Sequence, residues 1–348
     1  MINAGILGST GYAGAELVRL LSSHKDVNIK FLDSRTYDKE EYTNPYPHLK
    51  NKLDKVCKSI NIFESELLDE VDIVFCALPH GLSQDAVKVC ISKGKKIIDL
   101  SADFRIKDPS LYEKWYKTTH NAKEELKSAV YGLTEIYREK IKSSTVIANP
   151  GCYPTSILLA LYPLLKENII SSKGIIADSK SGVSGAGRNI MDSNLFSQCN
   201  ENIRGYSIGE HRHIPEIEQE IAAFAEEEAS IQFTPHLVPL NRGILSTIYA
   251  DNKKGVTQYD LEDIYGNYYK DEYFIRLFSR GELPQTKGVS GSNFCDIGLK
   301  VDERTGKIII VSAIDNLIKG AAGQAVQNMN LLFNLKENSG LEQMPLWP

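Results

Sequence analysis

The chain has 348 residues, of which 42% are hydrophobic and 24% are charged, and its formal net charge is -5. These values lie near globular averages and exclude a disordered chain, a fibrous repeat and a disulfide-stapled miniprotein. A net negative charge gives no attraction for nucleic acid or an anionic membrane surface, so a small-molecule partner is favoured. The length predicts a two-domain enzyme.

Six cysteines are scattered along the chain without a CxxC spacing. Several lie in apolar runs, where a thiol behaves as a small hydrophobe, and this usage is typical of the reducing cytoplasm. No basic segment precedes the first apolar stretch, and the longest apolar run, Ile157 to Leu165, is too short to span a bilayer. We therefore expect a cytoplasmic protein without a signal peptide or a membrane helix.

The first half of the chain alternates short β-branched runs with helical patterns, which is typical of a parallel sheet with crossover helices. The predicted strands are Asn3–Leu7, Val27–Leu32, Val71–Leu78, Lys96–Leu100 and Thr145–Ala148. The predicted helices are Tyr12–Leu21 and Leu82–Ser92. Together these elements predict an α/β domain with a doubly wound parallel sheet of the Rossmann type.

After Pro150 the pattern changes to consecutive strands, which predict a mixed or antiparallel sheet in an α+β domain. These strands are Gly174–Ser179, Ile231–Leu240, Ile244–Ala250, Phe294–Val301 and Lys307–Ala313. Apolar stripes predict helices over Pro215–Glu226 and Gly320–Phe333. We expect the last helix to pack on the first domain and the tail, Glu337–Pro348, to be irregular.

Glycines recur at positions 8, 11 and 14, between the first predicted strand and the first predicted helix. Such a loop permits a tight turn and a close approach of the backbone to a pyrophosphate, while the helix N-terminus offers free N–H groups. The GxxGxxG spacing is less specific than GxGxxG, and a glycine-rich turn before an ordinary helix is the alternative. Its position at the start of a βαβ pattern favours a dinucleotide site.

Asp33, Ser34 and Arg35 end the second predicted strand, where the adenosine ribose of a dinucleotide is usually bound. A carboxylate there favours NAD through the 2'-hydroxyl, whereas Arg35 with Ser34 favours NADP through the 2'-phosphate. The residues alone leave this choice open, since Arg35 also fits an ordinary surface position.

Cys152 follows a predicted strand that ends near Asn149, and Pro154 suits the first turn of a helix that runs through Leu165. The positive end of a helix dipole and the free N–H groups there lower a thiol pKa and stabilise a nucleophilic thiolate. The same N–H groups, with the Asn149 amide, can hold the oxyanion that forms when the sulfur attacks a carbonyl. We favour this interpretation for Cys152 and a buried structural role for the other five cysteines.

His211 and His213 stand two residues apart before a proline-led helix, so that one of them can serve as a general acid or base. No neighbouring Cys or His completes a tetrahedral set, and no metal is expected. Arg105 follows a strand, where a guanidinium suits a phosphate or carboxylate, although a surface ion pair fits equally well. The segment 181–188 is too glycine-rich for a helix and predicts a ligand-binding loop or a flexible connector.

Eight motifs resemble those of the N-acetyl-gamma-glutamyl-phosphate reductase family, in order and over nearly the whole chain. They are GSTGYAG at 8–14, SRTY at 34–37, ALPHG at 77–81, DLSADFR at 99–105, NPGCYPT at 149–155, SGVSGAGR at 181–188, GEHRHIPEI at 209–217 and DNLIKGAAGQAVQ at 315–327. The combination of NPGCYPT with HRHIPEI is highly specific, whereas the glycine motif is not.

The resemblance implies an NADP-binding Rossmann domain at 1–148, completed by a C-terminal helix at 316–335. It implies a catalytic and oligomerisation domain at 149–315, like those of aspartate-semialdehyde and glyceraldehyde-3-phosphate dehydrogenases, in a cytoplasmic homotetramer. The implied reaction, a step of arginine biosynthesis, reduces an acyl phosphate, N-acetylglutamyl 5-phosphate, to the semialdehyde with NADPH through a cysteine thioester.

The resemblance also implies roles for individual residues. Cys152 is the implied nucleophile and His211 the acid/base, with Asn149 assisting. The implied substrate contacts are Arg105, His213 and Arg188, and His213 competes with His211 for the acid/base role. The implied cofactor contacts are Gly8, Ser9, Thr10, Gly11, Tyr12, Gly14, Ser34, Arg35, Pro79, Ser101, Ser181, Gly182 and Asn316.

Three alternatives remain at this stage. A related reductase acting on aspartyl or aminoadipyl phosphate shares the same chemistry and differs only in its pocket. A cysteine acyltransferase or hydrolase uses Cys152 and His211 without a nucleotide. A non-catalytic NADP sensor needs the glycine loop but not the thiol.

Overall fold

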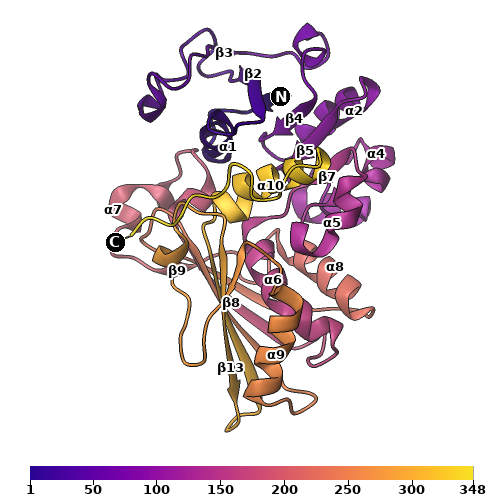
Figure 1. The fold of residues 1–348 in the computed structure, drawn as a ribbon, viewed down its shortest axis with the longest axis vertical. Helices are drawn as coiled ribbons and strands as arrows, with labels where there is room; N and C mark the ends of the chain where they lie inside the picture. Colours follow the sequence, from indigo (N-terminus) through magenta and orange to yellow (C-terminus); the bar gives the residue numbers. More distant parts are fainter. Residues whose placement is uncertain (348) are drawn as a thin grey trace. The chain divides into compact units, whose positions relative to one another are not determined.

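The computed structural model describes residues 1–347, apart from the side chain of Ser193, as two compact units (Figure 1). The first unit comprises Met1–Pro150 and Ala321–Glu342, and the second comprises Gly151–Gly320 and residues 343–347. The chain therefore passes from one unit to the other at three points, after Pro150, Gly320 and Glu342.

The first unit contains a parallel sheet of seven strands in the order β3-β2-β1-β4-β5-β7-β6. Its strands are β1 Ile2–Leu7, β2 Val27–Asp33, β3 Cys57–Lys58, β4 Ile73–Cys76, β5 Lys96–Asp99, β6 Val130–Tyr131 and β7 Val146–Ala148. The strand order reverses direction at β1, which lies between β2 and β4. In open α/β sheets such a reversal is where ligands bind, at the carboxyl ends of the strands.

Helices and short helical turns connect these strands. They are α1 Tyr12–Ser22, η1 Pro47–Leu49, η2 Glu66–Leu68, α2 Ser83–Ser92, α3 Pro109–Tyr116, α4 Lys123–Ser128, α5 Thr134–Lys142 and, from the far end of the chain, α10 Gly323–Leu332. Helix α10 contacts α1 and α5. Polar side chains fix it there, because Gln324 Nε2 and Asn328 Nδ2 both donate to the Gly132 carbonyl oxygen, at 2.9 and 2.8 Å.

The second unit is built on a mixed sheet of seven strands in the order β12-β13-β14-β11-β8-β10-β9. The strands are β8 Ile175–Ser181, β9 Arg204–Gly205, β10 Ile231–Leu237, β11 Ile244–Asp251, β12 Ile275–Leu277, β13 Cys295–Asp302 and β14 Lys307–Ile314. Buried and more exposed residues alternate along β8, β10 and β11, as expected of a sheet with one covered face.

Three long helices pack on this sheet: α6 Cys152–Lys166, α8 Ile214–Ala225 and α9 Gln258–Tyr269. Figure 1 shows them gathered on one side of the strands of their unit. The shorter elements are η3 Val183–Ala186, η4 Asp192–Asn194, α7 Phe196–Cys199, η5 Thr286–Val289 and a π-helical turn, η6 Ile318–Ala322. A single hydroxyl cluster joins α6 to the sheet, since Ser156 Oγ donates to Ser246 Oγ at 3.0 Å and to Ser312 Oγ at 3.1 Å.

The predicted fold class is confirmed, since a parallel Rossmann-like sheet is followed by a mixed sheet. All ten predicted strands are present, with ends displaced by a few residues. The last helix differs, because a π-helical turn replaces the first part of the predicted Gly320–Phe333 and α10 begins at Gly323. The predicted tail contains no helix or strand from 337 to 347, and Pro348 lies outside the described residues.

Candidate active site

The glycine loop joins β1 to α1 and is shaped by contacts that leave no room for side chains. A Cβ on Gly8 would lie 2.5 Å from the Ala77 carbonyl oxygen, and the Gly8 φ is +70°. A Cβ on Gly14 would lie 2.4 Å from the Gly8 carbonyl oxygen. Gly11 is the N-cap of α1, whose first turn carries no acidic residue and no side-chain cap among the described residues. The loop and the N–H groups that follow it therefore fit the pyrophosphate of a dinucleotide.

Asp33, the carboxylate that left the cofactor choice open, is buried and bonded to the backbone. Its Oδ2 accepts from the Gly8 N–H and its Oδ1 from the Ile60 N–H, both at 3.0 Å. The Asp33 carbonyl oxygen accepts from the Ser9 hydroxyl at 2.8 Å. The carboxylate thus holds the glycine loop in place, while Arg35 two residues later is exposed.

Two tyrosines that the sequence did not single out complete this side of the loop. The hydroxyl of Tyr42 donates to the Ser9 carbonyl oxygen at 2.7 Å, and that of Tyr46 donates to the Thr10 carbonyl oxygen at 2.8 Å. Thr10 Oγ1 and Ser34 Oγ lie 2.8 Å apart. Both tyrosines come from an irregular segment after β2, so no periodic pattern marks them.

A buried carboxylate joins the loops that follow β4 and β5. Asp103 is fully buried and accepts hydrogen bonds from the Gly81 N–H, the Ser83 N–H and, at 2.6 Å, the Tyr112 hydroxyl. The Ser83 hydroxyl also donates to it at 2.7 Å, and these four converging donors stabilise a carboxylate that is shielded from water. The turn 79–83 is therefore fixed, with Pro79 exposed at its start.

A second buried carboxylate lies beside the first. The Ser101 hydroxyl donates to Asp99 at 2.8 Å and accepts from the Asp103 N–H at 3.0 Å. Burial, and then the charge of Asp103, raise the pKa of Asp99 above its usual range. Ser101 is 1% exposed, so its hydroxyl organises this network.

Arg105, the predicted phosphate ligand, and Asn149, the predicted oxyanion donor, both donate hydrogen bonds to backbone carbonyl oxygens. Arg105 is buried and donates from Nε to the Asn149 carbonyl oxygen and from Nη2 to the Leu100 carbonyl oxygen, both at 2.7 Å. The Asn149 amide donates to the Ala321 carbonyl oxygen at 3.0 Å and accepts from Asn328 at 3.2 Å. These contacts join the ends of β5 and β7 to the start of α10.

Cys152 is the first residue of α6, and Gly151 is the N-cap of that helix. Its side chain is half-buried, which distinguishes it from the buried thiols of Cys57, Cys76, Cys90 and Cys295. Burial raises the pKa of Cys57 to about 11 and that of Cys90 to about 12, so these two thiols stay protonated. The structure therefore places Cys152 at an accessible helix N-terminus, outside a sealed apolar core.

A glutamate missed by the sequence analysis ties the start of α6 to the start of α8. Glu216 is fully buried in the first turn of α8, and its Oε1 accepts from the Gly151 N–H at 2.8 Å. Its position in the motif GEHRHIPEI was the only available signal, because a glutamate in a first helical turn is usually exposed. The bond fixes the residue before Cys152 relative to the segment that carries the two histidines.

His211 lies in a cage of aromatic rings. Its ring centroid is 5.6 Å from those of Tyr153 and Tyr206, 5.3 Å from that of Phe233 and 4.8 Å from that of His213. The hydroxyls of Tyr153 and Tyr206 lie 3.0 Å apart. Tyr153 directly follows Cys152, so the cage joins the histidine to the start of α6.

This environment fixes the protonation of His211. The His213 N–H donates to His211 Nδ1 at 3.1 Å, which leaves the proton of the neutral ring on Nε2. Burial, and then the positive charge of Arg212, lower the pKa of His211 to about 4. At neutral pH His211 is therefore an uncharged ring whose Nε2–H can donate a hydrogen bond.

The glycine-rich segment 181–188 packs on the turn that precedes β11. A Cβ on Gly182 would lie 2.8 Å from the backbone nitrogen of Arg242, so a side chain is excluded there. The buried Ser181 hydroxyl donates to the Gly182 carbonyl oxygen at 3.0 Å, whereas Arg188 is exposed.

Asn316 lies in the same part of the second unit. Its Oδ1 accepts from the Gly243 N–H at 2.7 Å, and its Nδ2 donates to Ser184 Oγ at 3.0 Å. The amide predicted to reach a nicotinamide therefore joins two loops here.

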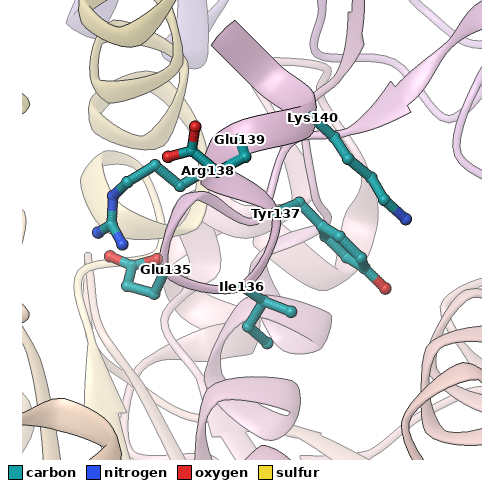
Figure 2. Close-up of a pocket in the computed structure, with 6 residues that line it drawn as sticks. All are labelled: Glu135, Ile136, Tyr137, Arg138, Glu139 and Lys140. Atoms are coloured by element: carbon teal, nitrogen blue, oxygen red, sulfur yellow. The ribbon is translucent and has the colours of Figure 1, made fainter.

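A surface concavity lies at α5 in the first unit. Helix α5 departs from helical geometry at Tyr137, and the concavity is lined by residues 135–140. Figure 2 shows Arg138 and Glu135 pointing toward the C-terminal segment, with Tyr137 and Lys140 on the opposite side. Arg138 pairs with Glu337 and thereby anchors that segment to α5.

Within residues 1–347, no group of three or more His, Cys, Asp or Glu side chains is arranged to hold a metal ion. None of the helices described in this range is long and apolar enough to cross a membrane.

Two family models match the chain. Residues 3–144 match the NAD binding domain of semialdehyde dehydrogenase, and residues 152–316 match its dimerisation domain. Curated relatives that match over their full length are named N-acetyl-gamma-glutamyl-phosphate reductase. The protein from Alkaliphilus metalliredigens is 65% identical and that from Thermoanaerobacter sp. (strain X514) 50% identical, each with 100% of both chains covered.

Solved structures of aspartate-semialdehyde dehydrogenases share the fold. Enzyme II from Vibrio cholerae superposes with a TM-score of 0.74 at 19% identity, over 96% of this chain and 98% of that one. The enzyme from Candida albicans, solved with NADP, superposes with a TM-score of 0.68 at 17% identity, over 96% of this chain and 98% of that one.

The lowered pKa of His211 predicts a loss of stability in mild acid. An unfolded chain takes up a proton near pH 6.5, whereas folded His211 does so only near pH 4, so the free energy of unfolding falls as the pH drops across this window. The total effect is about 3 kcal/mol. Urea titrations at several pH values should show wild type losing more stability than His211→Asn. Replacement of the exposed His48 by Asn should follow wild type, and parallel curves for all three proteins would refute the assignment.

Proposed function

The chain belongs to the N-acetyl-gamma-glutamyl-phosphate reductase family, and we propose that it reduces N-acetylglutamyl 5-phosphate to N-acetylglutamate 5-semialdehyde and phosphate. Its cofactor is NADP, and the reaction is a step of arginine biosynthesis. The observation that carries this proposal is the position of Cys152, half-buried at the first residue of α6 beside the aromatic cage of His211. The names of the relatives do not favour aspartyl or aminoadipyl phosphate as the substrate.

Cys152 captures the acyl group. Its thiolate attacks the acyl carbon, a C–S bond forms, and the bond from that carbon to the phosphate oxygen breaks. The departing phosphate takes up one proton, which balances the proton lost by the thiol. In the first turn of α6 Pro154 has no N–H and the Thr155 N–H donates to the Gly151 carbonyl oxygen, so the N–H groups of Cys152 and Tyr153 are the ones that stabilise the charge that develops on the substrate carbonyl oxygen.

NADPH, when bound at the glycine loop that joins β1 to α1, would supply the hydride that reduces the resulting thioester. The reduced carbon then carries an oxyanion, and the Nε2–H of His211 donates a hydrogen bond to this oxygen. The ring proton is on Nε2 because His211 Nδ1 accepts from the His213 N–H. Collapse of this oxyanion breaks the C–S bond and returns the thiolate. His213 is the alternative donor, because it stands at the N-terminus of α8 in the same cage.

The cofactor contacts proposed from the motifs fall into two groups. In the glycine loop, Ser9 is buried and shapes the backbone, while Thr10 and Ser34 pair their hydroxyls next to the exposed Arg35. Because Asp33 is bonded to two backbone N–H groups, Arg35 decides the preference for the 2'-phosphate. Remaining proposed contacts, with packing or polar roles, are Gly8, Gly11, Tyr12, Gly14, Pro79, Ser101, Ser181, Gly182 and Asn316.

Arg105 and Arg188 are the proposed cations for the substrate. Two carbonyl oxygens hold the Arg105 guanidinium in one orientation, and in this proposal it is the group that pairs with the substrate phosphate. Its bond to the Asn149 carbonyl oxygen links it to the motif that contains Cys152. The Asn149 amide supports this site by holding α10.

We propose that the second unit also forms a homo-oligomer, up to the tetramer that the motifs suggest, through the uncovered face of its sheet. Ile176, Tyr249 and Ile309 stand opposite one another on β8, β11 and β14 and form an apolar row. Ile176 is 44% exposed and Tyr249 37% exposed, on the face away from α6. A second copy of this chain is the partner that buries this row. The six cysteines are not joined in disulfides, which is consistent with a reducing cytoplasm.

Replacement of Cys152 by Ser should abolish turnover and spare cofactor binding. The hydroxyl is a far weaker nucleophile, so kcat for phosphate-dependent oxidation of the semialdehyde should fall by about 10³-fold or more. The Kd for NADPH, measured by fluorescence quenching, should change by less than about 2-fold. Cys199→Ser is the matched control, since Cys199 is the other half-buried cysteine.

Normal turnover by the Cys152→Ser protein would end the thioester mechanism. Absence of NADPH binding to wild type would favour a cysteine acyltransferase or hydrolase. Binding of NADPH without turnover of any semialdehyde would favour a sensor.

Substitutions at Arg35 and at Asp33 should change the affinities for NADPH and NADH in different ways. Arg35→Ala removes a charge-assisted contact to the 2'-phosphate, so the Kd for NADPH should rise by about 10-fold or more while that for NADH barely changes. Asp33→Asn loosens the glycine loop and should weaken both cofactors equally. A selective loss of NADH affinity in Asp33→Asn would show that the carboxylate contacts the ribose.

Charge on the apolar row should dissociate the oligomer. Tyr249→Asp places a carboxylate in a buried interface, where an unpaired charge is strongly unfavourable. Sedimentation equilibrium should show a lower mass for Tyr249→Asp than for wild type. Ile190→Asp is the control, because Ile190 is 89% exposed and lies outside the sheet. A wild-type monomer, or equal masses for all three proteins, would contradict the proposal.

A further inference from the structure

A π-helical turn, Ile318–Ala322, follows β14 and is organised by the side chain and backbone of Asp315. The Asp315 carbonyl oxygen accepts from the Gly320 N–H at 3.0 Å, which closes a loop one residue wider than an α-helical turn. The fully buried Asp315 carboxylate accepts from the Leu317 N–H at 2.9 Å and the Ile318 N–H at 3.2 Å. Turns of this kind are rare and occur frequently at functional sites.

Further contacts of Asp315 and Lys319 hold the start of this turn to the second unit. The other Asp315 oxygen accepts from the Gly291 N–H at 2.8 Å, and Arg242 lies 3.8 Å from it. The buried Lys319 ammonium lies 5.5 Å from the centroid of the Phe274 ring, an attractive cation–π contact. The turn is therefore anchored on three sides and is a rigid support.

Within this turn, Gly320 packs directly against Cys152, the proposed nucleophile. A Cβ on Gly320 would lie 2.7 Å from the Cβ of Cys152 and 3.2 Å from its Cα. The nearest atoms therefore belong to the rigid part of Cys152. The φ of Gly320 lies outside the left-handed region, so its backbone accepts any residue. The glycine is needed for the contact alone.

We propose that Gly320 is a positioning residue for Cys152. The inference rests on the proposed function, in which the Cys152 sulfur attacks the acyl carbon. The π-helical turn brings the Gly320 backbone into direct contact with Cys152, the first residue of α6. Because Gly320 has no side chain, its Cα can approach this closely, and the contact sets where the Cα–Cβ bond of Cys152 lies. Because the turn is anchored, added volume at position 320 displaces Cys152 rather than the turn.

The test compares Gly320→Ala with a matched steric change elsewhere in the unit. A Cβ on Gly298, in β13, would also lie 2.7 Å from a neighbour, but that neighbour is Cδ of Pro284. Both variants add one methyl group to a tight contact and should lose stability. Only Gly320→Ala should change the chemistry of the thiol.

The readouts separate positioning from stability. In Gly320→Ala, kcat and the rate of iodoacetamide alkylation at Cys152, followed by peptide mass spectrometry, should each fall by roughly 10- to 100-fold, since small displacements of a reacting group have effects of this size. The KM for NADP should change by less than about 2-fold. Gly298→Ala should keep wild-type kinetics. Wild-type kcat and alkylation in Gly320→Ala, with or without lost stability, would overturn the proposal.

A double variant covers the case in which Gly320→Ala fails to fold. Cys152→Gly removes the Cβ that the new methyl group meets, so Cys152→Gly/Gly320→Ala should recover stability relative to Gly320→Ala. Failure of this rescue would refute the direct contact. The outcome is distinguishable from failure of the proposed function, because in that case Cys152→Ser itself retains turnover.

Discussion

The hydrogen bond from the Gly151 N–H to the buried Glu216 carboxylate is the constraint from which the chemistry of the second unit follows. A hydrogen bond of this kind contributes on the order of 1 kcal/mol, and leaving its buried donor or acceptor without a partner costs about 1–3 kcal/mol. The bond uses the N-cap nitrogen of α6 and the first turn of α8, so the two helices start from a shared point. Cys152 and the histidine pair are placed on either side of that point by their positions in the chain.

A helix N-terminus supplies the electrostatic character of the glycine loop in the first unit and of the Cys152 segment in the second. Helix α1 begins at the glycine loop and α6 at Gly151, and each lacks an acidic residue in its first turn and a side-chain cap among the described residues. The end of α1 is suited to a pyrophosphate, while at α6 the Gly151 N–H already donates to Glu216 and the N–H groups that follow it are suited to an oxyanion. In the second unit, burial and the positive charge of Arg212 keep His211 uncharged at neutral pH.

The sequence predicted the two sheets and the location of Cys152 because these depend on local patterns, namely runs of β-branched residues and a glycine before a proline-led helix. It missed α9, although Thr257 and Asp260 form a capping box, because the helix is amphipathic only weakly. Glu216, Tyr42 and the π-helical turn could not be predicted, since their contacts join segments distant in sequence. The return of residues 343–347 to the second unit, where the Leu346 N–H donates to the Ser290 carbonyl oxygen, has no local signal either.

The motifs contain buried residues that bond to the protein itself and exposed residues that can contact a ligand. Asp33, Asn149 and Asn316 use both ends of their polar groups on the protein itself, whereas Arg35 and Arg188 remain exposed. Loops that approach a ligand through their backbone have N–H and carbonyl groups that no regular element satisfies, and buried side chains must bond them. A motif around such a loop therefore contains residues that hold the loop as well as residues suited to contact a ligand. The side-chain-free contact of Gly320 with Cys152 is the extreme case, in which shape alone carries the role.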